Sequence, residues 1–385
     1  MSNSVTRVGI NAHLASTSAT YRAAGTSRYL MGLLTELRRI DAPERIVAYM
    51  SRLHAPGTLA ATSRFALRLS PLPTWRPAVR ILWEQFLWPG LLLRDGIDVV
   101  HGPAHALPLG WPGRSVVTIH DLSFLVDPTT FHLANHRYLQ TIVRLSVRRA
   151  TRIIAVSEST RRDIIRYLGA APERIDVIHE GVSAEFHPRA PDELAAFRAK
   201  HGLMDAFILF LGTIEPRKNL PRLLEAYAEL RRRGRVELPL VIAGGEGPGA
   251  AATFLRCESL GLQGSVRFVG FVPEEDKPLW YNSAHVFVFP SQYEGFGLPV
   301  LEAFACGTPV VASDRSSLPE VVGDAGLLVD PFDTTALAEA MTQVIEDANL
   351  RHRLIAAGQE QAARFSWTAA AEKTLDVYRA VHAER

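Results

Sequence analysis

Two carboxylates, Glu294 and Glu302, flank a glycine-containing turn and have seven residues between them. The turn, 295–297, follows an apolar, β-prone run at 285–290 and leads into a segment opened by Pro299. This order predicts a strand, a glycine turn and a helix N-terminus, because proline suits the first turn of a helix. Backbone N–H groups and the positive end of the helix dipole would then face a ligand anion. Carboxylates accept hydrogen bonds and suit hydroxyls. The pattern therefore predicts a ligand with a phosphate in its middle and hydroxyls at both ends, such as a nucleotide-sugar.

Each carboxylate also has a simpler interpretation. Glu302 could be an acidic residue that complements the helix N-terminus, and Glu294 could be a solvated loop residue. Taken together with the glycine turn, however, the pair favours ligand binding.

A second loop offers two cations. A strand-like apolar run ends at Gly212, and the loop 213–219 after it carries Arg217 and Lys218 before the next helix. Cations at the carboxyl end of a strand and beside a helix N-terminus can neutralise a diphosphate leaving group. The alternative is a pair of surface cations. We favour the diphosphate, because the helix opened by Pro299 should line the same edge of the sheet.

Three further features are less specific. The glycine-rich loop 244–249 resembles a dinucleotide-binding fingerprint, but the strand after it ends in Gly270-Phe271-Val272 without an acidic residue. The loop could make room for a nucleotide or be a simple turn. His120 ends a strand in the first half, where it could reach a ligand or pack as a structural histidine. Gly25 lies between the first strand and its helix, another helix start that favours anions.

The whole chain limits the class of protein. Its 385 residues favour two domains, at roughly 150 residues each. The hydrophobic fraction of 47% and the charged fraction of 21% fit a globular protein and exclude a disordered one. The net charge of +2 gives no general signal for polyanions, and we expect no nucleic-acid partner. Cys257 and Cys306 lie in apolar helical contexts and predict buried thiols. Cysteines and histidines show no metal-ligand spacing, so we expect no metal.

The expected location is cytoplasmic. The first residues lack a signal-peptide pattern, and the longest apolar run, 81–93, is too short to span a bilayer and contains Glu84. The arginine-rich stretch 144–166 suggests peripheral contact with an anionic membrane, at the inner face of the plasma membrane. Aromatic residues that could join this contact lie upstream: Trp75, Trp83, Phe86 and Trp88. The alternative is that the arginines form a solvated helix face or pair with carboxylates, and that the aromatic residues fill the core.

Short β-prone runs alternate with helical patterns, which predicts parallel α/β units. In the first half we expect strands at 6–11, 46–50, 98–101, 115–120, 152–157 and 175–179, and helices at 26–39, 78–93, 132–149 and 159–168. A turn-rich linker at 181–192 precedes a second α/β series, and helices at 334–346, 349–364 and 367–382 end the chain. Two doubly wound sheets should bind ligands at the carboxyl ends of their strands.

Over nearly its whole length the chain resembles the retaining GT-B glycosyltransferases of glycosyltransferase family 4. The most specific element is the Glu–seven–Glu motif at 294–302, and the segments 303–313 and 318–322 match the family's continuation. Segments 212–219 and 118–122 resemble the bacterial mannosyltransferases that assemble surface polysaccharides.

The resemblance implies an α/β fold of GT-B type, with two Rossmann-like doubly wound domains facing across a cleft. Residues 1–185 would bind the acceptor, residues 186–365 the nucleotide-sugar, and residues 366–385 would form a helix packing back on the first domain. The implied reaction moves a hexose, foremost mannose from GDP-mannose, to a glycan or lipid-linked sugar hydroxyl with retention and without a metal. The alternatives are UDP-glucose or a related donor, a GT-B epimerase, and a non-catalytic nucleotide-binding partner.

The resemblance also implies roles for individual residues. Glu302 would bind the ribose and Glu294 the hydroxyls of the transferred sugar. Arg217 and Lys218 would hold the diphosphate, and His120 would lie beside the reacting sugar. The catalytic set is therefore His120, Glu294, Arg217 and Lys218. The other donor-binding residues would be Gly25, Gly212, Gly245, Val272, Phe296, Gly297 and Leu298.

Overall fold

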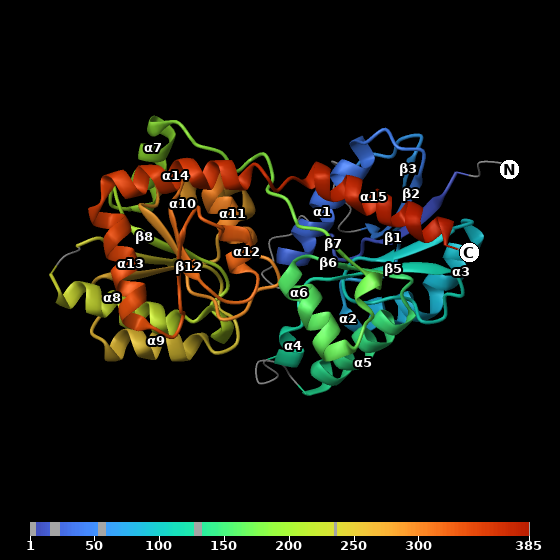
Figure 1. Cartoon of the computed structure of the whole chain (residues 1–385), viewed down its shortest axis with the longest axis horizontal. Helices are drawn as coiled ribbons and strands as arrows, with labels where there is room; N and C mark the ends of the chain where they lie inside the picture. The colour runs from blue at the N-terminus through green and yellow to red at the C-terminus, as the bar shows by residue number, and fades with distance from the viewer. Residues whose placement is uncertain (1–4, 16–23, 53–58, 127–132, 235–236, 385) are drawn as a thin grey trace. The chain divides into compact units, whose positions relative to one another are not determined.

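The computed structural model describes residues 5–15, 24–52, 59–126, 133–234 and 237–384 (Figure 1). The chain forms two compact units. The first comprises Met1–Gly181 together with Ser366–Arg385, and the second comprises Val182–Phe365.

The first unit is built on a seven-stranded parallel sheet in the order β3-β2-β1-β4-β5-β6-β7. Its strands are β1 (Arg7–Asn11), β2 (Arg45–Ser51), β3 (Phe65–Ser70), β4 (Val99–Gly102), β5 (Arg114–Ile119), β6 (Arg152–Ala155) and β7 (Ile175–Val177). All six strands expected in this half are present. The sequence analysis missed β3, an edge strand whose Arg68 and Leu69 are exposed, so it lacks a continuous apolar signal.

Helices cover both faces of this sheet. They are α1 (Ala24–Arg39), α2 (Pro77–Leu82), η3 (Trp83–Leu87), α3 (Trp88–Arg94), α4 (Ser123–Val126), α5 (Leu133–Arg149), α6 (Glu158–Asp163), η5 (Ile164–Leu168), η6 (Pro172–Arg174) and α15 (Trp367–Ala383). The expected helix at 78–93 is the continuous run α2–η3–α3, with a π-helical turn in its middle. Among the described residues, no helix is long and apolar enough to cross a membrane.

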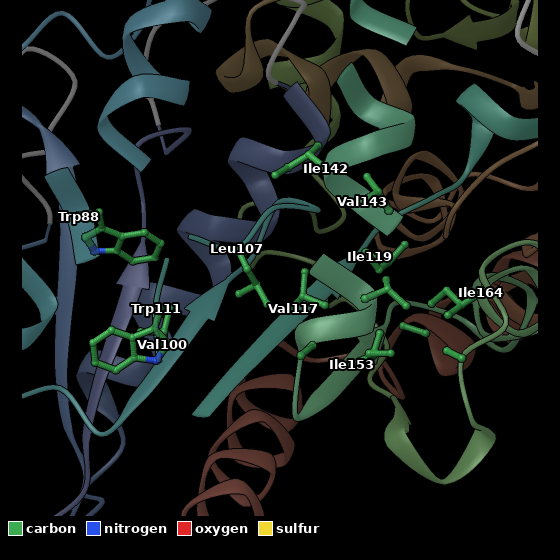
Figure 2. Close-up of a cluster of buried hydrophobic side chains, with 14 of the residues drawn as sticks. Trp88, Val100, Leu107, Trp111, Val117, Ile119, Ile142, Val143, Ile153 and Ile164 are labelled. Atoms are coloured by element: carbon green, nitrogen blue, oxygen red, sulfur yellow. The ribbon is translucent and has the colours of Figure 1, made fainter. Parts of the chain in front are cut away.

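Adjacent residues of β4 mark the two faces of the sheet, because successive side chains of a strand point to opposite sides. Val100 packs with Trp88, Val117 and Ile142 in one hydrophobic core, which lies between the sheet and the helices at 77–94 and 133–149 (Figure 2). His101, the next residue, bonds through Nδ1 to the hydroxyl of Tyr378 on α15, at 2.7 Å. The C-terminal helix therefore covers the opposite face, where it also packs against α1.

The tryptophans of the 77–94 segment belong to this core. Trp83 and Trp88 are buried and stacked, with ring centroids 5.7 Å apart. They are therefore not available for the membrane contact suggested by the sequence. By contrast, Phe86 is 75% exposed and Trp75 43%.

The arginine-rich stretch 144–166 is also divided. Arg152 forms an ion pair with Asp176 at 2.6 Å, and Arg161 pairs with Glu158 at 2.7 Å. These two arginines fit the alternative of pairing with carboxylates.

The second unit has a six-stranded parallel sheet in the order β10-β9-β8-β11-β12-β13. Its strands are β8 (Ile208–Leu211), β9 (Leu240–Ala243), β10 (Val266–Gly270), β11 (Val286–Phe289), β12 (Val310–Ser313) and β13 (Leu327–Val329). Its helices are α7 (Pro191–His201), η7 (Pro216–Lys218), α8 (Leu220–Arg232), α9 (Ala250–Ser259), η8 (Glu274–Asp276), α10 (Lys277–Ser283), α11 (Leu298–Ala305), α12 (Leu318–Val322), α13 (Thr334–Glu346) and α14 (Ala348–Ala362). Both cysteines are buried free thiols, as expected.

The segment after Gly181 is held by the second unit, although the sequence analysis placed the boundary at residue 185. Val182 donates its N–H to the carbonyl of Phe365 at 3.2 Å. Further along, Asn282 of α10 bonds to the backbone of His187 and Arg189, at 3.0 and 2.9 Å.

Both sheets reverse their strand order once. The reversal lies between β1 and β4 in the first sheet and between β8 and β11 in the second. In doubly wound sheets, ligands bind outside the carboxyl ends of the strands at such a switch point. The loops after β8 and β11 carry Arg217, Lys218 and Glu294, which the sequence predicted to bind a ligand.

Candidate active site

The loops after β8 and β11 meet through three charged side chains. Lys218 Nζ lies 2.6 Å from Glu294 Oε1, and Arg217 Nη1 lies 2.8 Å from Glu294 Oε2. Lys218 and Glu294 are 6% and 8% exposed. Lys218 Nζ also lies 4.5 Å from the ring centroid of Phe289, at the end of β11, within the range of a cation–π contact.

The two cations keep Glu294 ionised. Burial by itself would raise the pKa of this carboxyl, but the charges and hydrogen bonds of Arg217 and Lys218 outweigh it and lower the pKa to about 2. Burial lowers the pKa of Lys218 below its ordinary value, although the charge of Glu294 opposes this shift. At neutral pH Glu294 is therefore an ionised carboxylate that pairs with both basic side chains.

Backbone contacts hold the cation loop in place. Gln292 donates its backbone N–H to the carbonyl of Arg217 at 2.8 Å, and Arg217 Nη1 donates to the carbonyl of Tyr293 at 3.0 Å. Asn219 follows with a positive φ of 60°, and its Nδ2 donates to the carbonyl of Pro331 at 2.7 Å. Hydrogen bonds thus fix the loop after β8 to the loops after β11 and β13.

The turn around Glu294 is fixed from the loop after β12. Ser317 Oγ lies within hydrogen-bond distance of the carbonyls of Glu294 and Phe296, at 2.9 and 2.5 Å. Gly297 has a φ of 135°, a conformation that side chains rarely adopt, and it caps α11. No local sequence pattern predicts this contact of Ser317, because it depends on packing between two βα loops.

Glu302 lies deeper in the unit. It is 2% exposed, and it accepts a hydrogen bond from the hydroxyl of Tyr281 at 2.9 Å. Because α11 begins at Leu298, Glu302 is its fifth residue and lies in the second turn of the helix, beyond the first turn where an acidic residue would complement the N-terminus. Tyr281, on α10, was also missed.

The glycine-rich loop 244–249 packs against the cation loop. A side-chain carbon at Gly244 would collide with the carbonyl of Gly212, and Ile214 donates its N–H to the carbonyl of Gly245 at 2.9 Å. Tight packing therefore explains Gly244 without a nucleotide. Val272 lies beyond β10 and is buried, at 5% exposure. Phe296 and Leu298 are buried as well.

The remaining predicted residues belong to the first unit. His120 follows β5, and its ring nitrogens contact the Glu180 carboxylate at 3.2 Å and the Pro103 carbonyl at 2.8 Å. Gly25 is exposed in the first turn of α1, with open space where a side chain would begin. Most of the loop before Gly25 lies outside the described residues. Glu180 was not among the residues predicted from the sequence.

The second unit therefore combines cations and helix α11's N-terminus with carboxylates at one switch point. Cations and backbone N–H groups suit a phosphate, and carboxylates suit hydroxyls. In the ranges that the structure describes, no group of three or more His, Cys, Asp and Glu side chains is arranged to hold a metal ion.

Two parallel α/β units with this strand order, and this charge cluster at a switch point, define the architecture of a GT-B glycosyltransferase. A family model described as Glycosyltransferase Family 4 matches residues 23–186, and one described as Glycosyl transferases group 1 matches residues 193–361. The chain belongs to the family 4 glycosyltransferases of GT-B fold, and it is an enzyme that transfers glycosyl groups.

Two sequence relatives and one solved structure are similar to this chain. The chain is 39% identical over 289 residues to the O-antigen chain mannosyltransferase B of Escherichia coli, covering 74% of this chain and 76% of that protein. It is 34% identical over 276 residues to the serotype-specific mannosyltransferase WbdA of Escherichia coli, covering 69% of this chain and only 33% of that protein. The solved structure of a sucrose-phosphate synthase from Thermosynechococcus elongatus has the same fold, with a TM-score of 0.79, 22% identity, and coverage of 98% of this chain and 99% of that one.

Proposed function

We propose that this enzyme transfers mannose from GDP-mannose to a glycan or lipid-linked sugar hydroxyl in surface polysaccharide synthesis, with retention of configuration. The choice of mannose is supported by the 39% identity to an O-antigen chain mannosyltransferase across three quarters of both chains. The transfer chemistry is supported by one observation above all, the buried cluster of Arg217, Lys218 and Glu294.

In the proposed reaction, the donor diphosphate binds to cations that are already in position. Glu294 and the backbone of Tyr293 hold Arg217 and Lys218 beside the N-terminus of α11. When the diphosphate binds, Arg217 and Lys218 donate part of their hydrogen bonds to the phosphate oxygens in place of Glu294. Glu294 then accepts hydrogen bonds from hydroxyls of the sugar. Groups held in place in this way stabilise the charge of the departing diphosphate without reorganisation during the reaction.

The rest of the donor would be held deeper in the second unit. Glu302 accepts hydrogen bonds from the ribose hydroxyls, and the hydroxyl of Tyr281 fixes the orientation of this carboxylate. The departing phosphate takes the proton of the acceptor hydroxyl on the same face of the sugar. The protein thus contributes position and charge, and no metal.

A donor screen tests this function. Thermal unfolding is measured with GDP-mannose, UDP-glucose, GDP and UDP, since ligands that bind the folded state raise its stability. We expect GDP and GDP-mannose to raise the unfolding temperature, and GDP-mannose to label a sugar acceptor in a product of unchanged anomeric configuration. Transfer from UDP-glucose but not from GDP-mannose would identify UDP-glucose as the donor. Release of a free epimerised sugar, or binding without any reaction, would contradict glycosyl transfer.

We also propose that the first unit binds reversibly to an anionic membrane at the inner face of the plasma membrane. The α5 sequence contains no acidic residue. Arg137, Arg144 and Arg148 are exposed on it at spacings of seven and four residues, which places them on one face of the helix. Such a row of cations is attracted to anionic lipid.

A neighbouring row of apolar side chains supports the same proposal. Leu82, Phe86 and Leu93 of the 77–94 segment are 58%, 75% and 62% exposed, and the exposed Arg76 and Arg94 flank them. The inner sides of this segment and of α5 pack into one core, so their outer sides belong to one helical layer. We call Leu82, Phe86 and Leu93 the outer apolar row. Apolar side chains together with cations are the combination by which interfacial helices bind lipid.

A further inference from the structure

Both ring nitrogens of His120 face oxygen atoms, one of a backbone carbonyl and one of a carboxyl group. Nε2 lies 2.8 Å from the carbonyl oxygen of Pro103, and Nδ1 lies 3.2 Å from a carboxylate oxygen of Glu180. A carbonyl has no proton to donate, and a carboxyl group has none when it is ionised, so with Glu180 ionised each nitrogen carries a proton. With both nitrogens protonated, the ring of His120 is a cation.

The three groups come from the carboxyl ends of different strands. Pro103 follows β4, His120 follows β5, and Glu180 lies three residues after β7. Glu180 is 5% exposed, and its carboxylate reaches His120 from beyond the intervening strand β6. A buried carboxylate needs a partner, because an unpaired charge inside a protein is strongly destabilising.

The other groups that face His120 leave the positive charge on this ring. Tyr29 of α1 contacts it edge to face at 4.7 Å, and His105 lies at 5.5 Å. Burial, and next the charge of His120, lower the pKa of His105 to about 4 and that of His101 to about 3. Both neighbouring histidines are therefore neutral at pH 7. The carboxylates of Glu180 and Asp121, by contrast, raise the pKa of His120.

We propose that Glu180 is a positioning residue that keeps His120 doubly protonated and fixes its ring, so that His120 takes part in glycosyl transfer as a cation and hydrogen-bond donor and never as a base. This inference rests on the proposed function for its catalytic meaning. A histidine with both nitrogens protonated cannot accept the proton of the acceptor hydroxyl. That proton must leave by another route, and the departing phosphate of the donor offers one.

The pKa of His120 has a direction that agrees with this geometry. Burial lowers it, but the hydrogen bond and charge of Glu180, followed by the carbonyl of Pro103 and the charge of Asp121, raise it above its ordinary value. Replacing Glu180 by glutamine removes the negative charge and keeps the size of the side chain. Burial should then dominate, and the ring should lose its proton at a lower pH.

The first experiment needs no substrate. The titration of His120 is followed by NMR in protein with labelled histidine, and its signal is identified by its loss in His120→Asn. We expect His120 to stay protonated through neutral pH in the parent protein and to become neutral below pH 7 in Glu180→Gln. An unchanged titration in Glu180→Gln would overturn the proposal, and this outcome does not depend on which donor the enzyme uses.

The second experiment separates positioning from a purely structural role. In Glu180→Gln, kcat should fall as pH rises, by about tenfold per pH unit above the new pKa of His120, whereas the parent profile stays flat there. The KM for the donor should change less than kcat. Glu180→Asp keeps the charge with a shorter reach and should restore part of the activity near neutral pH. If stability changed in Glu180→Gln while the pH profile did not, the role of Glu180 would be structural only.

Discussion

Lys218 Nζ and Glu294 Oε1 lie 2.6 Å apart, although 76 positions separate the two residues along the chain. Both side chains are more than nine-tenths buried, and Arg217 binds the other oxygen of the same carboxylate. Arg217 also pairs with Glu215 at 2.7 Å, so the two cations face two carboxylates. A diphosphate must compete with Glu294 for these cations. Binding of the donor diphosphate would therefore free the Glu294 carboxylate to accept hydrogen bonds from the sugar.

Alanine in place of Arg217 or Lys218 should reduce kcat strongly. Loss of one preorganised charge that stabilises the leaving group costs on the order of 100-fold or more in rate. Arg222→Ala is the matched control, since Arg222 lies on the exposed part of α8 and pairs with Glu225. Steady-state transfer assays decide the outcome, and near-parental turnover in both single variants would rule out the diphosphate role.

The two variants should differ in stability. Lys218 is buried and Arg217 is about a quarter exposed, so Lys218→Ala leaves Glu294 less well compensated. Breaking a buried pair typically costs about 3–5 kcal/mol, so we expect a clear loss in Lys218→Ala and a smaller one in Arg217→Ala. Denaturant unfolding measures both. Equal losses would contradict the difference in burial.

The two motif carboxylates should be separable by ligand. Glu302→Ala should weaken binding of both GDP and GDP-mannose, because it removes the proposed ribose contact. Glu294→Ala should spare GDP and impair transfer. Calorimetry with GDP compares the variants, and Tyr281→Phe serves as a milder change that removes only the hydrogen bond to Glu302. An equal loss of GDP affinity in the two alanine variants would refute the division of roles.

Acid should destabilise the second unit through Glu294. Its pKa is about 2 in the folded protein and about 4.5 without partners, so its contribution is present above pH 4.5 and is lost as pH falls toward 2. The contribution is on the order of 3 kcal/mol. The unfolding free energy of the parent and of Glu294→Gln should therefore converge in this acid range. Parallel curves from pH 5 to pH 2 would show that the ion pairs contribute nothing.

Vesicle binding should depend on both rows of the proposed membrane surface. Arg144→Glu with Arg148→Glu should weaken co-sedimentation with anionic vesicles, at about 1 kcal/mol for each arginine lost, and salt should weaken it further. Phe86→Ser should also weaken it by removing an apolar side chain of the outer apolar row. Arg231→Glu with Arg232→Glu, exposed on α8 of the second unit, makes the same change in charge and should leave binding unchanged.

The opposite result is equally clear. Parental binding in the α5 variant, or an equal loss in the α8 variant, would show that net charge alone attracts the protein. Absence of binding to anionic vesicles at low salt would refute the membrane proposal. If the protein did not bind vesicles but associated with another protein through Phe86, the outer apolar row would be a protein-binding surface.

Local patterns in the sequence determined most of the strand and helix order. They also determined that Arg217, Lys218 and Glu294 follow strands at the same edge of a sheet, because parallel α/β units place such loops together. The loops after β8 and β11 meet as expected. The edge strand β3 escaped detection, because a half-exposed strand has no continuous apolar run.

Only the tertiary structure decided which side chains meet across strands and which face water. Trp83 and Phe86 lie three residues apart on one helical segment, yet one fills the core and the other is exposed. The π-helical turn between α2 and α3 shifts the helical periodicity there, which a regular helix pattern cannot anticipate. Likewise, the pairing of His120 with Glu180 depends on the order of β5, β6 and β7 in the sheet. Such contacts come from the packing of distant segments, and no local pattern of residues records them.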